Sequence, residues 1–514
     1  MNRTKKAARN VIISMIGYAC VVVSGFIART AILRYMGIEM VGVGQLFSNI
    51  FMLLSYSSLG LETSIVYSLY EPLQQNDADK VCIIMNFYKK CFRYIEGAII
   101  ALTVLLLPVV PFMVKDSENI QDIYLILILY GLTSASSYFY AYKRSIIVAD
   151  QNRYMSTLFS DISAVIKLLA QVLIISLTQS YTLYMLTNVI VVISNMLVAR
   201  VAEIKYPYLS NHVQKKMVPA EKKELIRTTI AIVEQKLGFV VVFAIDSILM
   251  SAFLGMSVVG MYSNYLMVIN GLQAGIIIVF QSVTAGIGNL AITEDNVKLK
   301  ASWNVLNFIG YWIYAFSTVC LVVLFNPFIQ LWLGENYTFS MPILLLLVLH
   351  YYVEGMRKPV ITYKDAIGIQ WNDRWKPVVE VILNVIFSLL FIRWIGGIAG
   401  ILLAMSLSML LTSCWIEPYM LYKYGLHAEI GEYFKNYTIQ CVIVVLMTII
   451  TLLCASKIDL LGSGILYFGL KLVICIIVPN AIFVMCFCKS PELKSVVQIV
   501  KGLLMSGRKK GNGL

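Results

Sequence analysis

Charged side chains interrupt several long apolar runs of this sequence, where an ionisable group is costly and is therefore a functional candidate. Arg29, Lys167 and Lys236 are cations in such runs. A cation in a water-poor cavity can bind phosphate or another anion through charge-assisted hydrogen bonds. The structural alternative is that a long basic side chain extends to the membrane interface or pairs with a buried acid.

The position of each cation within its apolar run bears on whether it binds an anion or has a structural role. Arg34 precedes the helix-breaking Gly37 by three residues, which favours an interface anchor. Arg29 lies eight residues before Gly37, about 12 Å along a helix, which leaves the functional and structural interpretations open. Lys167 lies close to the middle of its apolar run and is the best-placed interior cation.

Carboxylates in the apolar runs are candidates for binding a coupling ion, because protonation of a buried acid can favour one conformation over another. These acids are Glu62, Asp161, Glu234 and Asp246. Glu354 differs from them, because Arg357 and Lys358 follow it at helical spacing and can neutralise it. We expect a structural role for Glu354.

Amide side chains in the same runs are candidates for binding sugars in a polar cavity: Asn49, Asn264 and Gln273. Packing between membrane helices also tolerates amides, and many of the 31 tyrosines fit an aromatic belt at the membrane interfaces. The chain has only three histidines, and most of its ten cysteines lie inside apolar runs. We therefore expect neither a metal site nor a cofactor.

The composition is that of an integral membrane protein. The 514 residues are 59% hydrophobic and 13% charged, whereas soluble domains average about 45–50% apolar and about 25% charged. A membrane-spanning helix needs about 20 apolar residues. By this criterion the sequence predicts an all-α fold with fourteen spans, at residues 11–36, 42–68, 87–112, 121–143, 156–177, 182–202, 231–254, 258–288, 303–325, 340–362, 376–394, 397–422, 437–456 and 461–487.

The distribution of basic residues supports this topology, because cytoplasmic loops are enriched in Lys and Arg. With a cytoplasmic amino terminus, 33 of the 41 basic residues fall in inside segments, and both termini are inside. The net charge of +13 is then explained by anionic membrane lipids and requires no nucleic acid. The same cytoplasmic basic residues are candidates for gathering an anionic headgroup: Lys89, Lys90, Arg93, Arg144 and Arg153.

The two halves of the chain repeat one another. The segment Tyr35 to Gly42, YMGIEMVG, resembles Phe253 to Gly260, FLGMSVVG, at an offset of 218 residues. Matching spans differ by an even number of crossings, so the repeats have parallel orientation. We expect a six-helix lobe at 1–203, a cytoplasmic linker at 204–228, a second six-helix lobe at 229–422, and two extra helices with a basic cytoplasmic tail at 423–514.

The segment GFIARTAILRYMG, the glycine break, the loop PFIQLWLGENY and fourteen spans in two halves together resemble the polysaccharide transporters. These belong to the multidrug/oligosaccharidyl-lipid/polysaccharide exporter superfamily, with the O-antigen flippases, the lipid II flippases and the multidrug exporters (MATE). The resemblance implies two lobes around a central cavity that alternates between inward- and outward-facing states. It implies an undecaprenyl-pyrophosphate-linked oligosaccharide as cargo, a bacterial plasma membrane, and polysaccharide polymerase and other assembly proteins as partners. It also favours Arg29 as a cavity residue.

A multidrug exporter and an enzyme are the two alternatives to a flippase. A cation-coupled multidrug exporter of the same superfamily would use acids such as Glu62, Asp161 and Asp246, although the interior cations and the two extra spans count against it. An enzyme would need a sizeable catalytic loop or a recognisable nucleophile, and the predicted external connections are short. We therefore expect a transporter and not an enzyme.

Overall fold

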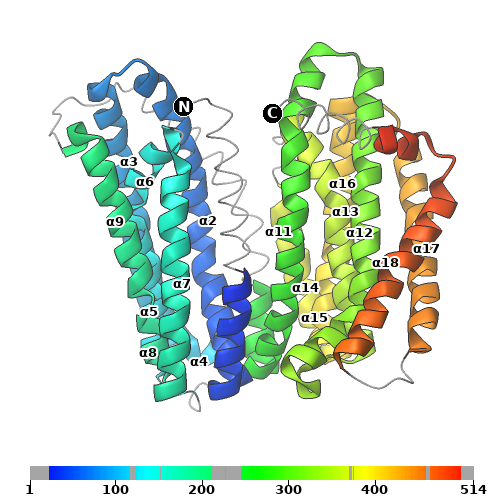
Figure 1. The fold of residues 1–514 in the computed structure, drawn as a ribbon, viewed down its shortest axis with the longest axis horizontal. Coiled ribbons are helices and arrows are strands. Elements are labelled where there is room, and N and C mark those ends of the chain that lie inside the picture. Colours follow the sequence, from blue (N-terminus) through cyan, green and yellow to red (C-terminus); the bar gives the residue numbers. More distant parts are fainter. Residues whose placement is uncertain are drawn as a thin grey trace, which may run out of the picture. The chain divides into compact units, whose positions relative to one another are not determined.

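The computed structural model of the chain describes residues 22–115, 120, 122–150, 152–210, 226, 245–369, 373, 375–458 and 464–498. Within these ranges it leaves the side chains at 53–64, 67, 153, 210, 285 and 292 undescribed. All regular elements in the described part are helices (Figure 1). The described residues fall into two compact units, Met1–Ser263 and Asn264–Leu514, with helix α11 crossing from one to the other.

The first unit begins with a helix at residues 22–36 and ends with helix Ile245–Leu254 and the start of α11. Between them lie α2 (Ile38–Gln74), α3 (Ala78–Leu106), η1 (Leu107–Val109), α4 (Val110–Met113), α5 (Ile123–Phe139), α6 (Ala141–Ala149), α7 (Arg153–Thr178), α8 (Tyr181–Leu186), α9 (Val189–Lys205) and η3 (Pro207–Ser210). In Figure 1 most of the long helices of this unit lie side by side along a common direction.

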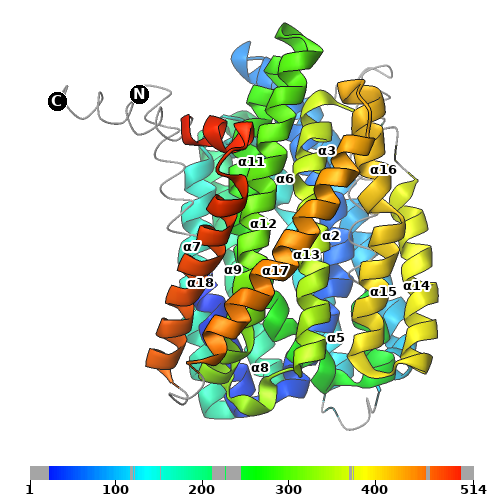
Figure 2. The same cartoon turned by 90° about the vertical axis from the view of Figure 1, so that its right-hand side faces the viewer.

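The second unit is a bundle built on the long helices α12 and α13. Its elements are the rest of α11 (Met256–Thr293), α12 (Asn296–Leu333), η4 (Glu335–Tyr337), α13 (Met341–Ile367), α14 (Lys376–Trp394), α15 (Gly397–Leu411), α16 (Ser413–Met420), the π-helical turn η6 (Leu421–Leu426), α17 (Gly431–Ser456) and α18 (Ile465–Phe487). Helices α17 and α18 pack on α12, where Val323, Ala455 and Cys475 are buried together (Figure 2).

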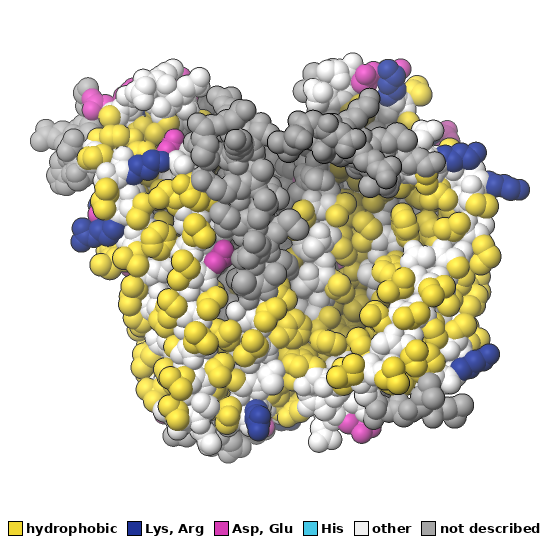
Figure 3. All heavy atoms as spheres, in the orientation of Figure 1, with side chains coloured by type: hydrophobic (Ala, Val, Ile, Leu, Met, Phe, Trp, Pro, Cys, Tyr) yellow, Lys and Arg dark blue, Asp and Glu magenta, His cyan; other side chains and the backbone are white. Residues whose placement is uncertain are grey.

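The protein is a multi-pass membrane protein by the length and composition of its helices. Nine helices in the described residues are long and apolar enough to cross a membrane, or ten if the bent pair α5–α6 forms one span. Figure 3 shows hydrophobic side chains covering the middle of the helices on one face, with most of the visible charged side chains toward the helix ends. This distribution suits a hydrocarbon layer between two polar surfaces. The number of fourteen spans stays a prediction.

Gly37 and Gly255 are 218 residues apart in the sequence. The same offset relates the starts of two pairs of helices. Helices α2 and α11 begin at Ile38 and Met256, and α3 and α12 begin at Ala78 and Asn296. The N-cap aspartates repeat as well. Asp77 accepts a hydrogen bond from the backbone of Lys80 at 2.9 Å, and Asp295 accepts one from the backbone of Lys298 at 3.1 Å. Equivalent capping chemistry therefore starts equivalent helices.

Each copy of the repeat begins with a glycine break. Gly37 separates helix 22–36 from α2 with φ of 84°, and Gly255 separates helix Ile245–Leu254 from α11 with φ of 92°. These angles lie in the left-handed region, which glycine adopts without the steric penalty of a Cβ atom. The sequence correctly placed both breaks.

Candidate functional site

Arg29 projects from helix 22–36 onto the start of α11 within the first unit. Its guanidinium NH1 donates a hydrogen bond of 2.7 Å to the Ser263 hydroxyl, which in turn donates one of 2.8 Å to the Gly260 carbonyl. The Arg29 side chain is half-buried, whereas Arg34 on the same helix is exposed. The two arginines therefore lie in different environments, as their positions relative to Gly37 indicated.

Three tyrosines lie in the neighbourhood of the Arg29 guanidinium: Tyr130 of α5, and Tyr181 and Tyr184 of α8. The Tyr130 and Tyr181 hydroxyls are hydrogen-bonded at 3.1 Å, and the Tyr181 and Tyr184 rings stack with centroids 5.2 Å apart. Tyr181 and Tyr184 are buried.

Lys167 projects from α7 toward the candidate membrane span Tyr181–Lys205, which contains Tyr181 and Tyr184. Its Nζ donates a hydrogen bond of 3.2 Å to the Asn188 side chain, at the join between α8 and α9. Asn188 follows Tyr184 by four residues, and Tyr184 lies in the neighbourhood of Arg29. Both predicted interior cations thus lie in the first unit, and both neighbour the span Tyr181–Lys205.

Asn49 belongs to a polar cluster in the first unit. It donates a hydrogen bond of 2.6 Å to Ser247 and accepts one of 2.8 Å from Gln45. Asn49 and Ser247 are both buried, and these bonds join α2 to helix Ile245–Leu254. The contact makes Asn49 a link between helices, and its role in binding sugar stays a prediction.

The other two predicted amides lie in α11 within the second unit. Gln273 donates a hydrogen bond of 3.0 Å to the carboxylate of Glu354 in α13. Asn264 is fully buried, and neither polar atom of its amide has a hydrogen-bond partner among the described residues. Gln273 therefore joins α11 to α13, whereas the predicted role of Asn264 in binding sugar stays a prediction.

The predicted acids have different environments. Asp161 of α7 is half-buried, and Asp246 is 2% exposed in helix Ile245–Leu254. The side chain of Glu62 lies outside the described residues, as do Glu234 and Lys236. Among the residues that the structure describes, no three potential metal ligands come together.

The basic residues expected to gather a headgroup also differ in exposure. Lys90 and Arg93 of α3 are exposed, whereas Lys89 and Arg144 are half-buried. The side chain of Arg153 is outside the described part of the structure. Lys90 and Arg93 are thus the members of this set that are most accessible to an anionic lipid.

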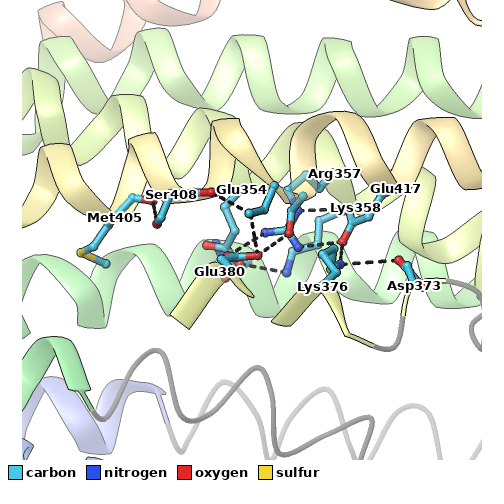
Figure 4. A network of polar contacts seen from close by, with 12 residues as sticks. Glu354, Arg357, Lys358, Asp373, Lys376, Glu380, Met405, Ser408 and Glu417 are labelled. Carbon is cyan, nitrogen blue, oxygen red and sulfur yellow. Dashed lines mark hydrogen bonds and ion pairs between the residues drawn. The ribbon is translucent and has the colours of Figure 1, made fainter. Parts of the chain in front are cut away.

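A charged network joins α13, α14 and α16 in the second unit (Figure 4). Arg357 donates two hydrogen bonds to Glu417, at 3.0 and 2.8 Å, and lies 3.8 Å from Glu380. Lys358 pairs with Glu354 at 3.0 Å. The remaining pairs are Lys376 with Glu417 and Asp373, and Lys364 with Asp373. Its members are four carboxylates and four cations, so the network neutralises itself and is a structural element rather than an anion site.

This network corrects one detail of the sequence interpretation. Lys358 neutralises Glu354, as the helical spacing predicted, but Arg357 does not pair with it. Arg357 pairs instead with Glu417, sixty positions later in the chain, because α16 packs against α13 and places this acid within reach of the guanidinium.

Several residues of the site were not identified from sequence. Tyr181, Tyr184 and Asn188 carry no motif, although the spacing of the two tyrosines by three residues could have indicated a shared helix face. Glu380 and Glu417 lie in predicted spans, and their charge alone could have marked them as buried partners.

Comparison with known proteins identifies the architecture. No protein-family model and no curated protein matches the sequence. Among solved structures, the lipid II flippase MurJ in an inward closed conformation is similar with a TM-score of 0.61, at 16% identity over 93% of this chain and 99% of that chain. The chain has the fold of the MOP transporters.

Two multidrug transporters of this fold are also similar. DinF-BH, a MATE multidrug transporter, has a TM-score of 0.58 at 16% identity, over 82% of this chain and 95% of that chain. A MATE family transporter of the MOP superfamily in an inward-facing conformation has a TM-score of 0.55 at 12% identity, over 78% of this chain and 95% of that chain. All three structures are transporters, and at these identities the likeness concerns the fold, while the MOP fold itself leaves the substrate open.

Proposed function

We propose that the protein is a flippase that moves an undecaprenyl-pyrophosphate-linked oligosaccharide from the cytoplasmic to the outer face of the bacterial plasma membrane. Its fourteen spans would form two six-helix lobes and two extra helices, with both termini in the cytoplasm. The lobes would alternate access to a central cavity, and the oligosaccharide would then enter surface polysaccharide. This proposal names the lipid-linked sugar, and not a drug, as the cargo of a MOP-type transporter.

The observation that carries the proposal is the convergence of Arg29 and Lys167 on one stretch of the span Tyr181–Lys205. Arg29 lies in the neighbourhood of Tyr184, and Lys167 donates a hydrogen bond to Asn188. Neither cation forms an ion pair with a described carboxylate within 4.0 Å, unlike the cations of the α13–α14–α16 network. A diphosphate carries charge on two linked phosphates, which two nearby cations can neutralise.

The test replaces each cation in a strain whose surface polysaccharide depends on this protein. We expect Arg29→Ala and Lys167→Ala to abolish surface-polysaccharide assembly while the protein remains in the membrane. Arg34→Ala is the matched control, because Arg34 is an exposed arginine on the same helix as Arg29. Normal polymer at normal protein levels in both variants would overturn the assignment.

A cation-coupled multidrug exporter is the second candidate function, and Asp246 favours it. This carboxylate is 2% exposed in an apolar helix, a setting in which proton binding can favour one conformation. Drug resistance in an overexpressing strain that disappears with Asp246→Asn would support the exporter. Unchanged drug sensitivity, together with loss of surface polysaccharide in the Arg29 and Lys167 variants, would support the flippase.

A further inference from the structure

A backbone crossing within the first unit lies beside the Arg29 site. A Cβ atom on Gly42 would lie 2.1 Å from the carbonyl oxygen of Met256, and a Cβ atom on Gly260 would lie 2.3 Å from the carbonyl oxygen of Ile38. These four residues are two pairs related by the offset of 218, so each copy of the repeat presents the same glycine to the same partner. The start of α2 and the start of α11 thus cross in a pseudo-twofold arrangement.

Side chains also meet at this crossing, where Cγ1 and Cδ1 of Ile38 lie 2.9 and 3.0 Å from the Cβ position on Gly260. Ser257 of α11 donates a hydrogen bond of 3.3 Å to Glu39 of α2, and these two residues are themselves related by the offset of 218. Since glycine allows the backbones to meet, the contact is short-ranged and is lost once the helices separate by a small distance.

The Arg29–Ser263 hydrogen bond connects this crossing to Arg29, one of the two cations that we propose bind the diphosphate. Ser263 accepts from Arg29 at 2.7 Å and donates to the carbonyl of Gly260, the residue whose Cα packs against Ile38. Arg29 therefore holds the turn of α11 that makes the crossing. Ser263 offers the guanidinium one neutral oxygen, whereas a diphosphate offers several charged oxygens that a guanidinium can bind through two parallel bonds.

We propose that Arg29 is a ligand-sensitive latch, in which a lipid-linked diphosphate takes the guanidinium from Ser263 and thereby weakens the crossing of α2 and α11. The planar guanidinium prefers two parallel bonds to one phosphate over a single bond to a hydroxyl. Binding at the site then favours the conformation in which the crossing is open. This inference rests on the proposed function, because it assigns Arg29 to the diphosphate of the same cargo.

The experiment measures the closed crossing by chemical cross-linking. Glu39→Cys and Ser257→Cys are combined in the full chain, and a short bifunctional thiol reagent is applied in proteoliposomes, with each single variant as background. Undecaprenyl diphosphate is the probe, and undecaprenol, which lacks the diphosphate, is its control. We expect the diphosphate lipid to lower the cross-linking yield at least about 3-fold, and undecaprenol to leave it unchanged.

Ser263→Ala tests the latch without removing the cation. We expect this variant to cross-link weakly with or without the diphosphate lipid, because Arg29 no longer holds α11. Ser282→Ala is the matched control, since Ser282 lies on the same helix and its hydroxyl donates to the carbonyl of Val279 in its own turn. Ser282→Ala is expected to behave as the unsubstituted pair does.

Two results would overturn the latch. One is a Ser263→Ala variant that cross-links as strongly as the Ser282→Ala control, and the other is a yield that undecaprenyl diphosphate does not change. Neither result depends on whether surface polysaccharide is made. Failure of the proposed function would appear separately, as normal polymer in the Arg29→Ala strain.

Discussion

Arg357 and Glu417 form a two-pronged ion pair, in which Nε and NH2 of the guanidinium donate to the two carboxylate oxygens at 3.0 and 2.8 Å. The Glu417 side chain is 1% exposed and also pairs with Lys376. Removing one member of such a group leaves uncompensated charge away from water, which costs more than the ion pair contributes. The pair therefore holds α13 against α16, and Lys376 joins α14 to both helices by pairing with Glu417.

We predict that Glu417→Gln lowers the free energy of unfolding by about 3–5 kcal/mol, because Arg357 and Lys376 lose a buried counter-ion. The measurement is thermal unfolding of the detergent-solubilised protein. Glu294→Gln is the control, because Glu294 forms an exposed helical pair with Lys298 at 2.7 Å and should contribute less than about 1 kcal/mol. Equal effects of the two substitutions would contradict the structural importance of the network.

Alanine substitutions at two glycines of α11 are predicted to change the stability of the protein in opposite directions. Gly260→Ala should destabilise the protein by about 1–3 kcal/mol, because the new Cβ atom would lie 2.3 Å from the Ile38 carbonyl. Gly275→Ala in the same helix meets nothing within 4 Å and should stabilise it by about 0.5–1 kcal/mol, since alanine favours helix more than glycine does. Melting temperatures of the two variants distinguish these outcomes, and a stabilised Gly260→Ala would contradict the close approach.

The sequence predicted those parts of the fold that depend on local chemistry. Glycine at positive φ marked both helix breaks. The spans predicted to follow them began at 42 and 258, whereas α2 and α11 begin earlier, at Ile38 and Met256, because each helix restarts directly after its glycine. The pairing of Glu354 with Lys358 followed from helical spacing alone. Each of these features is set within a few residues of the chain, where periodicity and steric limits act.

The contacts of the candidate site could not be predicted in this way. Arg29 meets Ser263, which is 234 positions away, and nothing in either neighbourhood of the sequence specifies the other. Arg357 had a near carboxylate in Glu354 but pairs with the distant Glu417, because the packing of α13 against α16 decides which acid it reaches. Long-range pairing of this kind depends on tertiary packing, which a single sequence does not display.

Substitution of Lys167 is expected to reduce transport without lowering the stability of the protein. Lys167→Met removes a half-buried charge and keeps an apolar chain, so the melting temperature should stay the same or rise while transport falls at least about 10-fold. Lys167→Arg keeps the charge and should retain part of the activity. The measurement is transfer of undecaprenyl-diphosphate-linked oligosaccharide across proteoliposomes. A Lys167→Met variant that transports normally would remove Lys167 from the site.

The appended helix α18 is fixed to α12 by a side-chain pair that a double-mutant cycle can measure. The Trp312 indole N–H donates to the Asn480 side chain at 3.0 Å, and the Trp312 ring stacks on Phe483 with centroids 5.4 Å apart. Asn480→Leu leaves the indole N–H without its acceptor and should cost about 1–3 kcal/mol in the free energy of unfolding. In a Trp312→Phe background the same substitution should cost much less, because no donor remains to be satisfied. Equal costs in the two backgrounds would show that this hydrogen bond does not hold α18 in place.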